Sequence, residues 1–186
     1  MKNLVIFASG NGSNALNLIR HFKGSDIAVK AVFCNKTGAG VIQKALDEGV
    51  PVFLFDRKMS SEFSSLDTEL EKYAPDLIVL AGYLWLFPAR LLAKYRDRVI
   101  NLHPALLPKY GGKGMWGEAV HSAVLANAES ETGITIHYVN EHYDEGRVIA
   151  QARCEVQPGD SPASLAARIH ELEHKLLPET IEKLLR

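Results

Sequence analysis

The feature that most constrains this chain is a regular alternation, over its first hundred residues, of short apolar runs with helix-like segments. Runs with little polar alternation are typical of strands buried on both faces, and five are present: Leu4–Ala8, Ile27–Phe33, Val52–Phe55, Leu77–Ala81 and Val99–Leu102. Helical spacing occupies the segments between them: Asn14–Phe22, Val41–Glu48, Ser61–Tyr73 and Pro88–Tyr95. This order predicts a Rossmann-like α/β fold, with a mostly parallel twisted sheet and helices on both faces.

After His103 the pattern changes to a loop, a helix and two strand-like segments that can pair as antiparallel strands: Pro104–Gly117, Gly117–Ala126, Ile134–Val139 and Val148–Val156. A final helix opens at Ser161-Pro162, where a cap and a first-turn proline belong, and runs to about Leu185. We expect Pro178 to bend or break this helix, because proline lacks the backbone N–H that an interior position donates.

Composition narrows the class of protein. The chain has 186 residues, of which 47% are hydrophobic and 23% charged, and its formal net charge is -1, which gives no reason to expect nucleic acid or an anionic membrane as a partner. Met1-Lys2-Asn3-Leu4 lacks the layout of a signal peptide, so we expect a cytoplasmic protein, a monomer or a homodimer. Cys34 and Cys154 have no metal-like spacing, and we expect both to be reduced core residues.

A glycine-containing loop joins the first predicted strand to the first predicted helix. Ser9-Gly10-Asn11-Gly12-Ser13-Asn14 combines two glycines with small polar residues, so its backbone can turn tightly and expose amide groups. The helix that follows adds the partial positive charge of its first turn, and together these make an anion site suited to a phosphate. The alternative is a tight turn without a ligand.

Two other motifs point to different chemistry. Gly10-x-Gly12-x-x-Ala15 satisfies a loose dinucleotide fingerprint, but Cys34-Asn35-Lys36 stands where an acidic residue is needed. That disfavours an NAD enzyme and leaves open an NADP enzyme that uses Lys36. His170-Glu171-Leu172-Glu173-His174 matches the zinc-protease pattern, but no further histidine follows it. We interpret it as a solvated helix face or a polar contact to a ligand.

The most informative segment is Asn101-Leu102-His103-Pro104-Ala105-Leu106-Leu107-Pro108. Asn101 and His103 alternate at the end of a predicted strand, so both side chains project to the same side. Ligands of parallel sheets bind beyond the carboxyl ends of the strands. An amide and an imidazole placed there can hydrogen-bond to an oxygen that gains negative charge, which predicts a catalytic pair. The alternative is two polar residues that cap the sheet.

A second candidate is the acidic loop Asn140-Glu141-His142-Tyr143-Asp144-Glu145-Gly146, which follows a predicted strand. Asp144 is its candidate catalytic carboxylate, although acidic loops are usually only solvated. We interpret His121, His137 and His142 as structural or surface residues.

Taken together, these segments resemble the folate-dependent phosphoribosylglycinamide formyltransferases. The resemblance runs in order over nearly the whole chain, through Ser9–Asn14, Ala31–Lys36, Tyr73–Tyr83, Asn101–Tyr110, Gly133–Val139 and Asp144–Gly146. The Asn-His-Pro segment and the later aspartate are shared by formyl-folate transferases and hydrolases of this superfamily. The loop after the first strand is the part that points to the enzymes of purine synthesis.

The resemblance implies transfer of a formyl group from the co-substrate 10-formyltetrahydrofolate to the amine of 5′-phosphoribosylglycinamide, through a tetrahedral oxyanion and without a metal. It implies that Asn101, His103 and Asp144 are catalytic, with Asn101 and His103 donating to the oxyanion and Asp144 positioning His103 and a water. The implied contacts to the ribotide and its phosphate come from Asn11, Gly12, Ser13, Asn14, His170 and Glu173. The implied folate contacts come from Tyr83, Leu84, Trp85, Leu86, Phe87, Val139, Asn140 and Glu141. We expect one domain over residues 1–186, with the phosphate-binding half in about 1–100 and the catalytic and folate-side half in about 101–186.

Several positions depart from the family pattern. Trp85 stands where a basic residue is frequent, and His170 stands where a polar amide often contacts the substrate phosphate. A protonated His170 can do the same task with a more pH-sensitive affinity. The loop Tyr110–Gly133 is longer than usual, and Lys58 is the nearest match to a family basic residue before the third helix.

Three alternatives stay open. A methionyl-tRNA formyltransferase is expected to carry a further carboxyl-terminal domain and a basic surface. A formyltetrahydrofolate hydrolase is expected to carry an amino-terminal regulatory domain. A non-catalytic phosphate-binding module explains the glycine loop but leaves Asn101 and His103 without a task.

Overall fold

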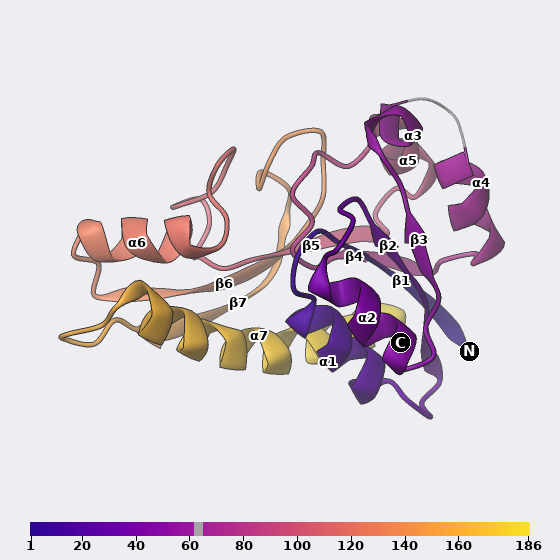
Figure 1. Cartoon of the computed structure of the whole chain (residues 1–186). Coiled ribbons are helices and arrows are strands. Elements are labelled where there is room, and N and C mark those ends of the chain that lie inside the picture. The colour runs from indigo at the N-terminus through magenta and orange to yellow at the C-terminus, as the bar shows by residue number, and fades with distance from the viewer. Residues whose placement is uncertain (62–64) are drawn as a thin grey trace.

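A seven-stranded sheet organises the computed structural model, which describes residues 1–61 and 65–186 (Figure 1). Its strand order is β3-β2-β1-β4-β5-β6-β7, with β1 to β5 parallel, β6 antiparallel to β5, and β7 antiparallel to β6. The strands are β1 (Lys2–Ala8), β2 (Ile27–Cys34), β3 (Val52–Leu54), β4 (Leu77–Leu80), β5 (Val99–His103), β6 (Glu131–Tyr138) and β7 (Val148–Glu155). The Rossmann-like sheet with an antiparallel pair in the C-terminal half is therefore confirmed.

Helices lie on both faces of this sheet: α1 (Ser13–His21), α2 (Gly40–Asp47), α3 (Arg57–Ser61), α4 (Ser65–Lys72), α5 (Ala89–Lys94), α6 (Glu118–Ala126) and α7 (Pro162–Leu185). The predicted helix over Ser61–Tyr73 falls partly on residues 62–64, which lie outside the described residues. Within the described part of that prediction, α3 ends at Ser61 and α4 begins at Ser65.

Strand β1 shows why the apolar runs lack polar alternation. Leu4 and Ile6 face a core built with α1, α2 and α7, whereas Val5 and Phe7 face a second core built with α4 and α5. All four side chains are fully buried. Burial of each such side chain stabilises the fold by about 1.5–3 kcal/mol, so a strand covered on both faces gains from an apolar residue at every position.

We expected Pro178 to bend or break helix α7. The helix runs unbroken past Pro178, so a break is wrong, and a bend stays a prediction. Pro178 has no N–H to donate to the carbonyl of His174, four residues earlier. The side-chain amide of Asn17, on α1, donates to that carbonyl instead at 2.9 Å. A neighbouring helix thus supplies the hydrogen bond that the proline cannot make.

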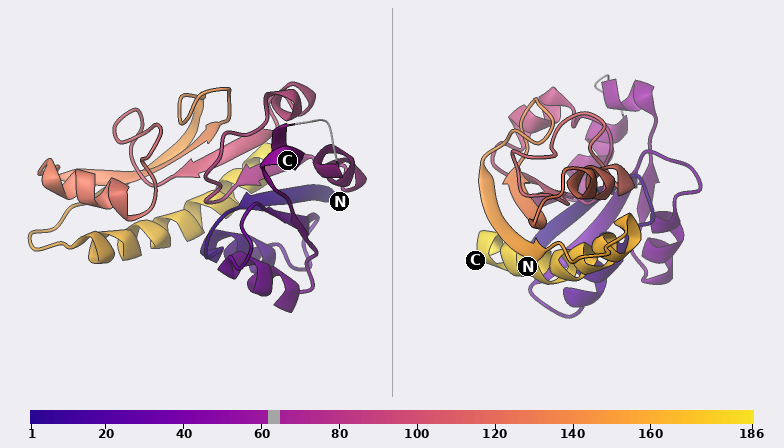
Figure 2. Two further views of the ribbon diagram at one scale, coloured as in Figure 1. Left: turned by 45° about the horizontal axis from the view of Figure 1, so that its top comes forward. Right: turned by 90° about the vertical axis from the view of Figure 1, so that its left-hand side faces the viewer.

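The long axis of the molecule places two groups of elements at opposite ends. Strands β6 and β7, helix α6 and the first turns of α7 lie at one end, and α3 and α4 lie at the other (Figures 1 and 2). Between them, β1 has its parallel neighbours β2 and β4 on opposite sides, and ligands of such sheets bind in the crevice at this point. Cys34 is buried and Cys154 half-buried, and both are free thiols. Among the described residues, no helix is long and apolar enough to cross a membrane.

Candidate active site

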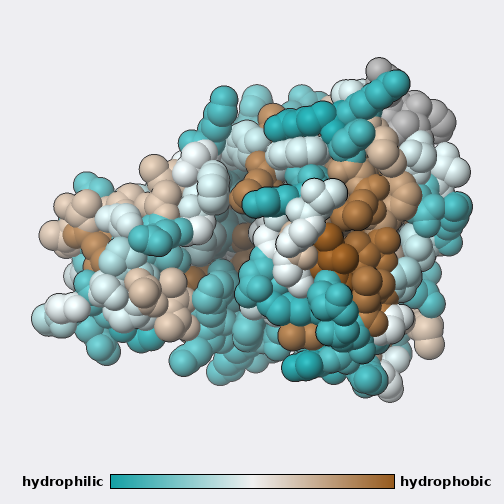
Figure 3. Space-filling model, viewed as in Figure 1, coloured by the Kyte–Doolittle hydropathy of each residue, from teal (hydrophilic) through white to brown (hydrophobic). Residues whose placement is uncertain are grey.

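A cavity of about 830 Å³ opens at the carboxyl ends of β1, β4 and β5. Its walls come from the loops that follow these strands, from the loop between β6 and β7, and from α6 and α7. The surface is hollowed at this place, between the α6–α7 end and the rest of the molecule (Figure 3). The volume lies within the range of about 300–1,000 Å³ that is usual for small-molecule sites.

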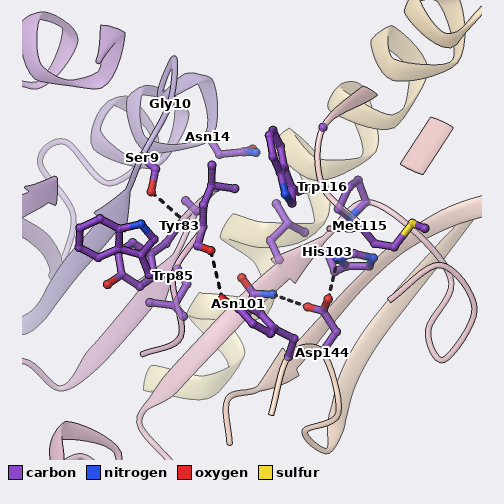
Figure 4. Close-up of a pocket in the computed structure, with 18 of the residues that line it drawn as sticks. Ser9, Gly10, Asn14, Tyr83, Trp85, Asn101, His103, Met115, Trp116 and Asp144 are labelled. Atoms are coloured by element: carbon purple, nitrogen blue, oxygen red, sulfur yellow. Dashed lines mark hydrogen bonds and ion pairs between the residues drawn. The ribbon is translucent and has the colours of Figure 1, made fainter. Parts of the chain in front are cut away.

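Asn101, His103 and Asp144 meet at the centre of this cavity, although Asp144 is distant in the chain (Figure 4). The Asn101 amide nitrogen donates to Asp144 Oδ1 at 3.3 Å. His103 Nδ1 lies 3.5 Å from Asp144 Oδ2. The structure therefore brings together the three residues predicted to be catalytic.

Asp144 is held in place by the backbone around it. The Gly112 N–H donates to Asp144 Oδ2 at 2.9 Å, and Asp144 itself has a positive φ of 57°. Gly146 passes so close to the preceding strand that a Cβ there would lie 1.5 Å from the Tyr138 carbonyl oxygen. Burial works to raise the pKa of the Asp144 carboxyl. The imidazoles of His137 and His103, each 3.5 Å from a carboxylate oxygen, and the Gly112 N–H outweigh burial and hold that pKa below its usual range. Asp144 is thus a carboxylate at neutral pH.

A backbone carbonyl determines which ring nitrogen of His103 carries the proton. Its Nε2 lies 2.7 Å from the carbonyl oxygen of Tyr110, which only accepts, so Nε2 is the donor. Burial lowers the pKa of His103, and the opposing charge of Asp144 does not fully offset it. The neutral ring therefore presents an unprotonated Nδ1 beside Asp144. That nitrogen can take a proton, and the carboxylate stabilises the resulting cation.

His137 is a site residue that the sequence interpretation left among the structural or surface histidines. It lies directly opposite Asn101 in the antiparallel β5–β6 pair and is 2% exposed. His137 Nδ1 donates to the Tyr138 carbonyl at 2.9 Å, so its Nε2 is free to accept from the Asn101 amide at 3.1 Å. This contact fixes which end of the Asn101 amide faces Asp144. The register of β5 against β6 identifies His137 as a site residue, and no local sequence pattern predicts that register.

The glycine loop forms one end of the cavity. Gly12 caps α1 with a left-handed φ of 78°, and no side chain caps the free N–H groups of the first turn. A Cβ on Gly12 would lie 2.5 Å from Val41, so a close approach of α2 also requires glycine here. Lys44 contacts both the carbonyl and the side-chain oxygen of Asn11. Asn11, Gly12, Ser13 and Asn14 all line the cavity, as predicted for a phosphate loop.

Glu173 closes the same end of the cavity from α7. It is 4% exposed, accepts from the Asn14 amide at 2.8 Å, and lies 2.7 Å from His170 Nδ1. The hydrogen bond to Glu173 raises the pKa of His170. The structure therefore joins the predicted ribotide residues from α1 and α7 in one chain of contacts.

The loop after β4 forms the opposite end. The Leu84 N–H donates to Ser9 Oγ at 3.0 Å, which ties this loop to the end of β1. Leu84 is 38% exposed and Leu86 47% exposed, and Trp85 carries the Arg57 guanidinium 4.0 Å above its ring. Seven predicted folate residues line the cavity: Tyr83, Leu84, Trp85, Leu86, Phe87, Val139 and Asn140. Glu141 does not line it, and Arg57 lines it where Lys58 was suggested.

The long segment after Tyr110, for which we predicted no ligand contacts, supplies another wall of the cavity. Glycines at 112, 114 and 117 adopt positive φ. Met115 and Trp116 line the cavity (Figure 4), and so does His121. Within residues 1–61 and 65–186 no group of three or more His, Cys, Asp or Glu is arranged to hold a metal ion. In the His170–His174 motif, His170 pairs with Glu173 instead, and His174 does not line the cavity.

Known proteins are similar to this chain in both sequence and fold. The model of a family described as formyl transferase matches residues 2–181. A chloroplastic phosphoribosylglycinamide formyltransferase of Arabidopsis thaliana is 40% identical over 97% of this chain, which spans only 64% of that relative's length. The Bacillus subtilis phosphoribosylglycinamide formyltransferase is 36% identical, over 100% of this chain and 95% of its own length. A crystal structure of glycinamide ribonucleotide transformylase 1 from Geobacillus kaustophilus is 38% identical and superposes with a TM-score of 0.90, covering 100% of both chains.

Proposed function

This chain belongs to the formyl transferase family, and from that premise we propose that it moves the formyl group of 10-formyltetrahydrofolate to the amine of 5′-phosphoribosylglycinamide, a step of purine synthesis. One observation carries the proposal. A single cavity joins a phosphate-type loop, an Asn-His-Asp centre and an aromatic, apolar end. The names of the relatives point to the same reaction.

The two ends divide the ligands between them. The free N–H groups of α1 and the exposed edge of His170 suit the phosphate of the ribotide, and Glu173 suits its hydroxyl groups. Leu84, Leu86 and Trp85 offer the flat, apolar contact that a pterin ring needs. With both ligands in place, the ribotide amine and the formyl carbon meet at the Asn-His-Asp centre.

The amine then attacks the formyl carbon, a C–N bond forms, and the carbonyl oxygen becomes an oxyanion. The long 3.3 Å hydrogen bond from Asn101 to Asp144 is the one that this oxyanion replaces, while the bond to His137 keeps the amide oriented. One such donor is worth roughly 3 kcal/mol of transition-state stabilisation.

The proton of the attacking amine passes to Nδ1 of neutral His103, either directly or through a water bound to Asp144. The imidazolium that forms lies 3.5 Å from the Asp144 carboxylate, which stabilises it. His103 then delivers the proton to N10 of the folate as the C–N10 bond breaks. The products are formylated ribotide and tetrahydrofolate, and His103 returns to its neutral form.

The polar end is what distinguishes ribotide transfer from hydrolysis, because a hydrolase needs only water at the centre. Purified protein mixed with 10-formyltetrahydrofolate should release tetrahydrofolate only when 5′-phosphoribosylglycinamide is added. Deformylation of equal rate without the ribotide would identify a hydrolase, and no deformylation under either condition would reject the proposal. Asp144→Asn is the inactive control.

A further inference from the structure

His121 is a buried imidazole that the reaction scheme leaves unused. It lies on α6, is 3% exposed, and lines the cavity. Its Nδ1 is covered by protein and has no hydrogen-bond partner, and Nε2 makes no hydrogen bond to any residue that the structure describes. Because Nδ1 is the nitrogen that protein covers, Nε2 is the ring nitrogen that a ligand in the cavity can reach. A cavity-lining imidazole without a protein partner at that nitrogen points to a partner that arrives with a ligand.

The surroundings of His121 belong to the ribotide end of the cavity. Helix α6 packs against α7. The charged and titratable groups that act on His121 are Glu173 and His170 of α7, Glu118 of its own helix, and His103 of β5. Burial outweighs them and lowers the pKa of His121, so the ring is neutral at neutral pH.

Two side chains in this region offer acceptors. Asn14 gives its amide nitrogen to Glu173, and its Oδ1 is buried without a partner. The Glu173 carboxylate accepts from Asn14 and pairs with His170 through Oε2, which leaves Oε1 as an acceptor. A hydroxyl group donates one hydrogen bond and can also accept, so a hydroxyl that donates to Glu173 or Asn14 still needs a donor beside it. A neutral imidazole with its proton on Nε2 supplies that donor.

We propose that His121 is a specificity-determining residue, whose Nε2–H donates to a ribose hydroxyl of the phosphoribosyl substrate while Glu173 or Asn14 accepts from the same diol. The inference rests on the proposed function and extends it to a residue outside the Asn-His-Asp centre. It assigns different tasks to the two histidines at this end of the cavity: His170, paired with Glu173, for the phosphate, and His121 for the sugar.

The test compares the Michaelis constants of the two substrates. His121→Phe keeps the ring volume and removes the donor, and it should raise the KM for the ribotide about tenfold, the effect of losing one hydrogen bond, with the KM for formyl-folate unchanged. His121→Asn keeps a donor and should recover part of the loss. His174→Phe is the matched control, because His174 also carries a buried, unpaired ring nitrogen on a helix but does not line the cavity. It should leave both constants unchanged.

Ribotides that lack one hydroxyl identify the atom concerned. Either the 2′-deoxy or the 3′-deoxy analogue should be used about tenfold less efficiently than the ribotide by the unmodified protein. That difference should shrink in His121→Phe, because only the contact to Glu173 or Asn14 then remains. Retention of the full difference, or an equal rise in both Michaelis constants, would overturn the inference. An unmodified protein without ribotide-dependent activity would instead reject the proposed function, so the two failures are separable.

Discussion

The two ends of the cavity are built by different means. At the ribotide end, side chains from α1 and α7 contact one another, with Glu173 accepting from Asn14 and pairing with His170. At the other end, the loop after β4 is held by its backbone, through the Leu84 N–H to Ser9 Oγ and the Gly82 carbonyl to the Ser9 N–H, and it exposes Leu84 and Leu86. The ribotide end presents polar side chains that can bind charges and hydroxyl groups. The other end presents an apolar surface. Substitutions should therefore separate the two substrates.

The largest effect on activity is expected from substitutions in the Asn-His-Asp centre, which lies between the two ends and acts on the reaction of both substrates. Asn101→Ala, His103→Ala and Asp144→Asn should each lower kcat by about 10² or more. They remove, in that order, a transition-state donor, the proton carrier, and the carboxylate that stabilises the charged form of that carrier. Steady-state kinetics measure the effect, with circular dichroism to confirm folding. Near-normal turnover in all three variants would contradict a catalytic role for these residues.

A large one-sided effect is expected from Glu173→Gln. It removes the charge that holds His170 and the carboxylate acceptor, at a cost of about 1.5–3 kcal/mol for a hydrogen bond to a charged group. The KM for the ribotide should rise roughly tenfold to a hundredfold, with the KM for formyl-folate unchanged. Equal effects on both constants would break the proposed division of the cavity.

The opposite one-sided effect is expected from Trp85→Ala, and it should be smaller. The change removes apolar contact and the Arg57 guanidinium that stacks on the ring, an interaction worth about 0.5–1 kcal/mol at exposed sites. The KM for formyl-folate should rise severalfold, while that for the ribotide stays constant. Leu46→Ala, at an exposed apolar residue away from the cavity, is the control and should change neither.

The smallest effect concerns stability and pH. Because the pKa of His170 is raised in the folded protein, its pairing with Glu173 stabilises fully below the unfolded pKa of about 6.5 and is lost as pH rises through the folded value. The unmodified protein should exceed His170→Gln in unfolding free energy more at about pH 6 than at about pH 9. The His170 side chain is 54% exposed, so the difference should stay below about 1 kcal/mol. Urea unfolding at both pH values measures it, and a constant difference would contradict the pairing.

The two halves of the chain also differ in what their sequence reveals. The apolar runs of β1, β2 and β4 are continuous because both faces are covered, and this local signal predicts them well. The Asn101–His103 pair follows from alternation on a single strand. Asp144, in contrast, is only an acidic loop residue until the resemblance to the family is taken into account.

His137 and His121 could not be assigned from the sequence, for a physical reason. His137 reaches Asn101 through the register of β5 against β6, and His121 enters the cavity through the packing of α6 on α7. Both are long-range relationships that no local pattern encodes. Pro178 teaches the same lesson, because the hydrogen bond that allows it comes from α1.

An isotope label on the formyl carbon tests most directly whether the cavity transfers the formyl group to the ribotide. In a single turnover with 10-[¹³C]formyltetrahydrofolate and 5′-phosphoribosylglycinamide, NMR should detect the label as an amide carbon on the ribotide, with almost none in free formate. His103→Ala under the same conditions should leave the label on the folate. Label released as formate at the same rate with and without ribotide would contradict a cavity that gathers both substrates around Asn101, His103 and Asp144.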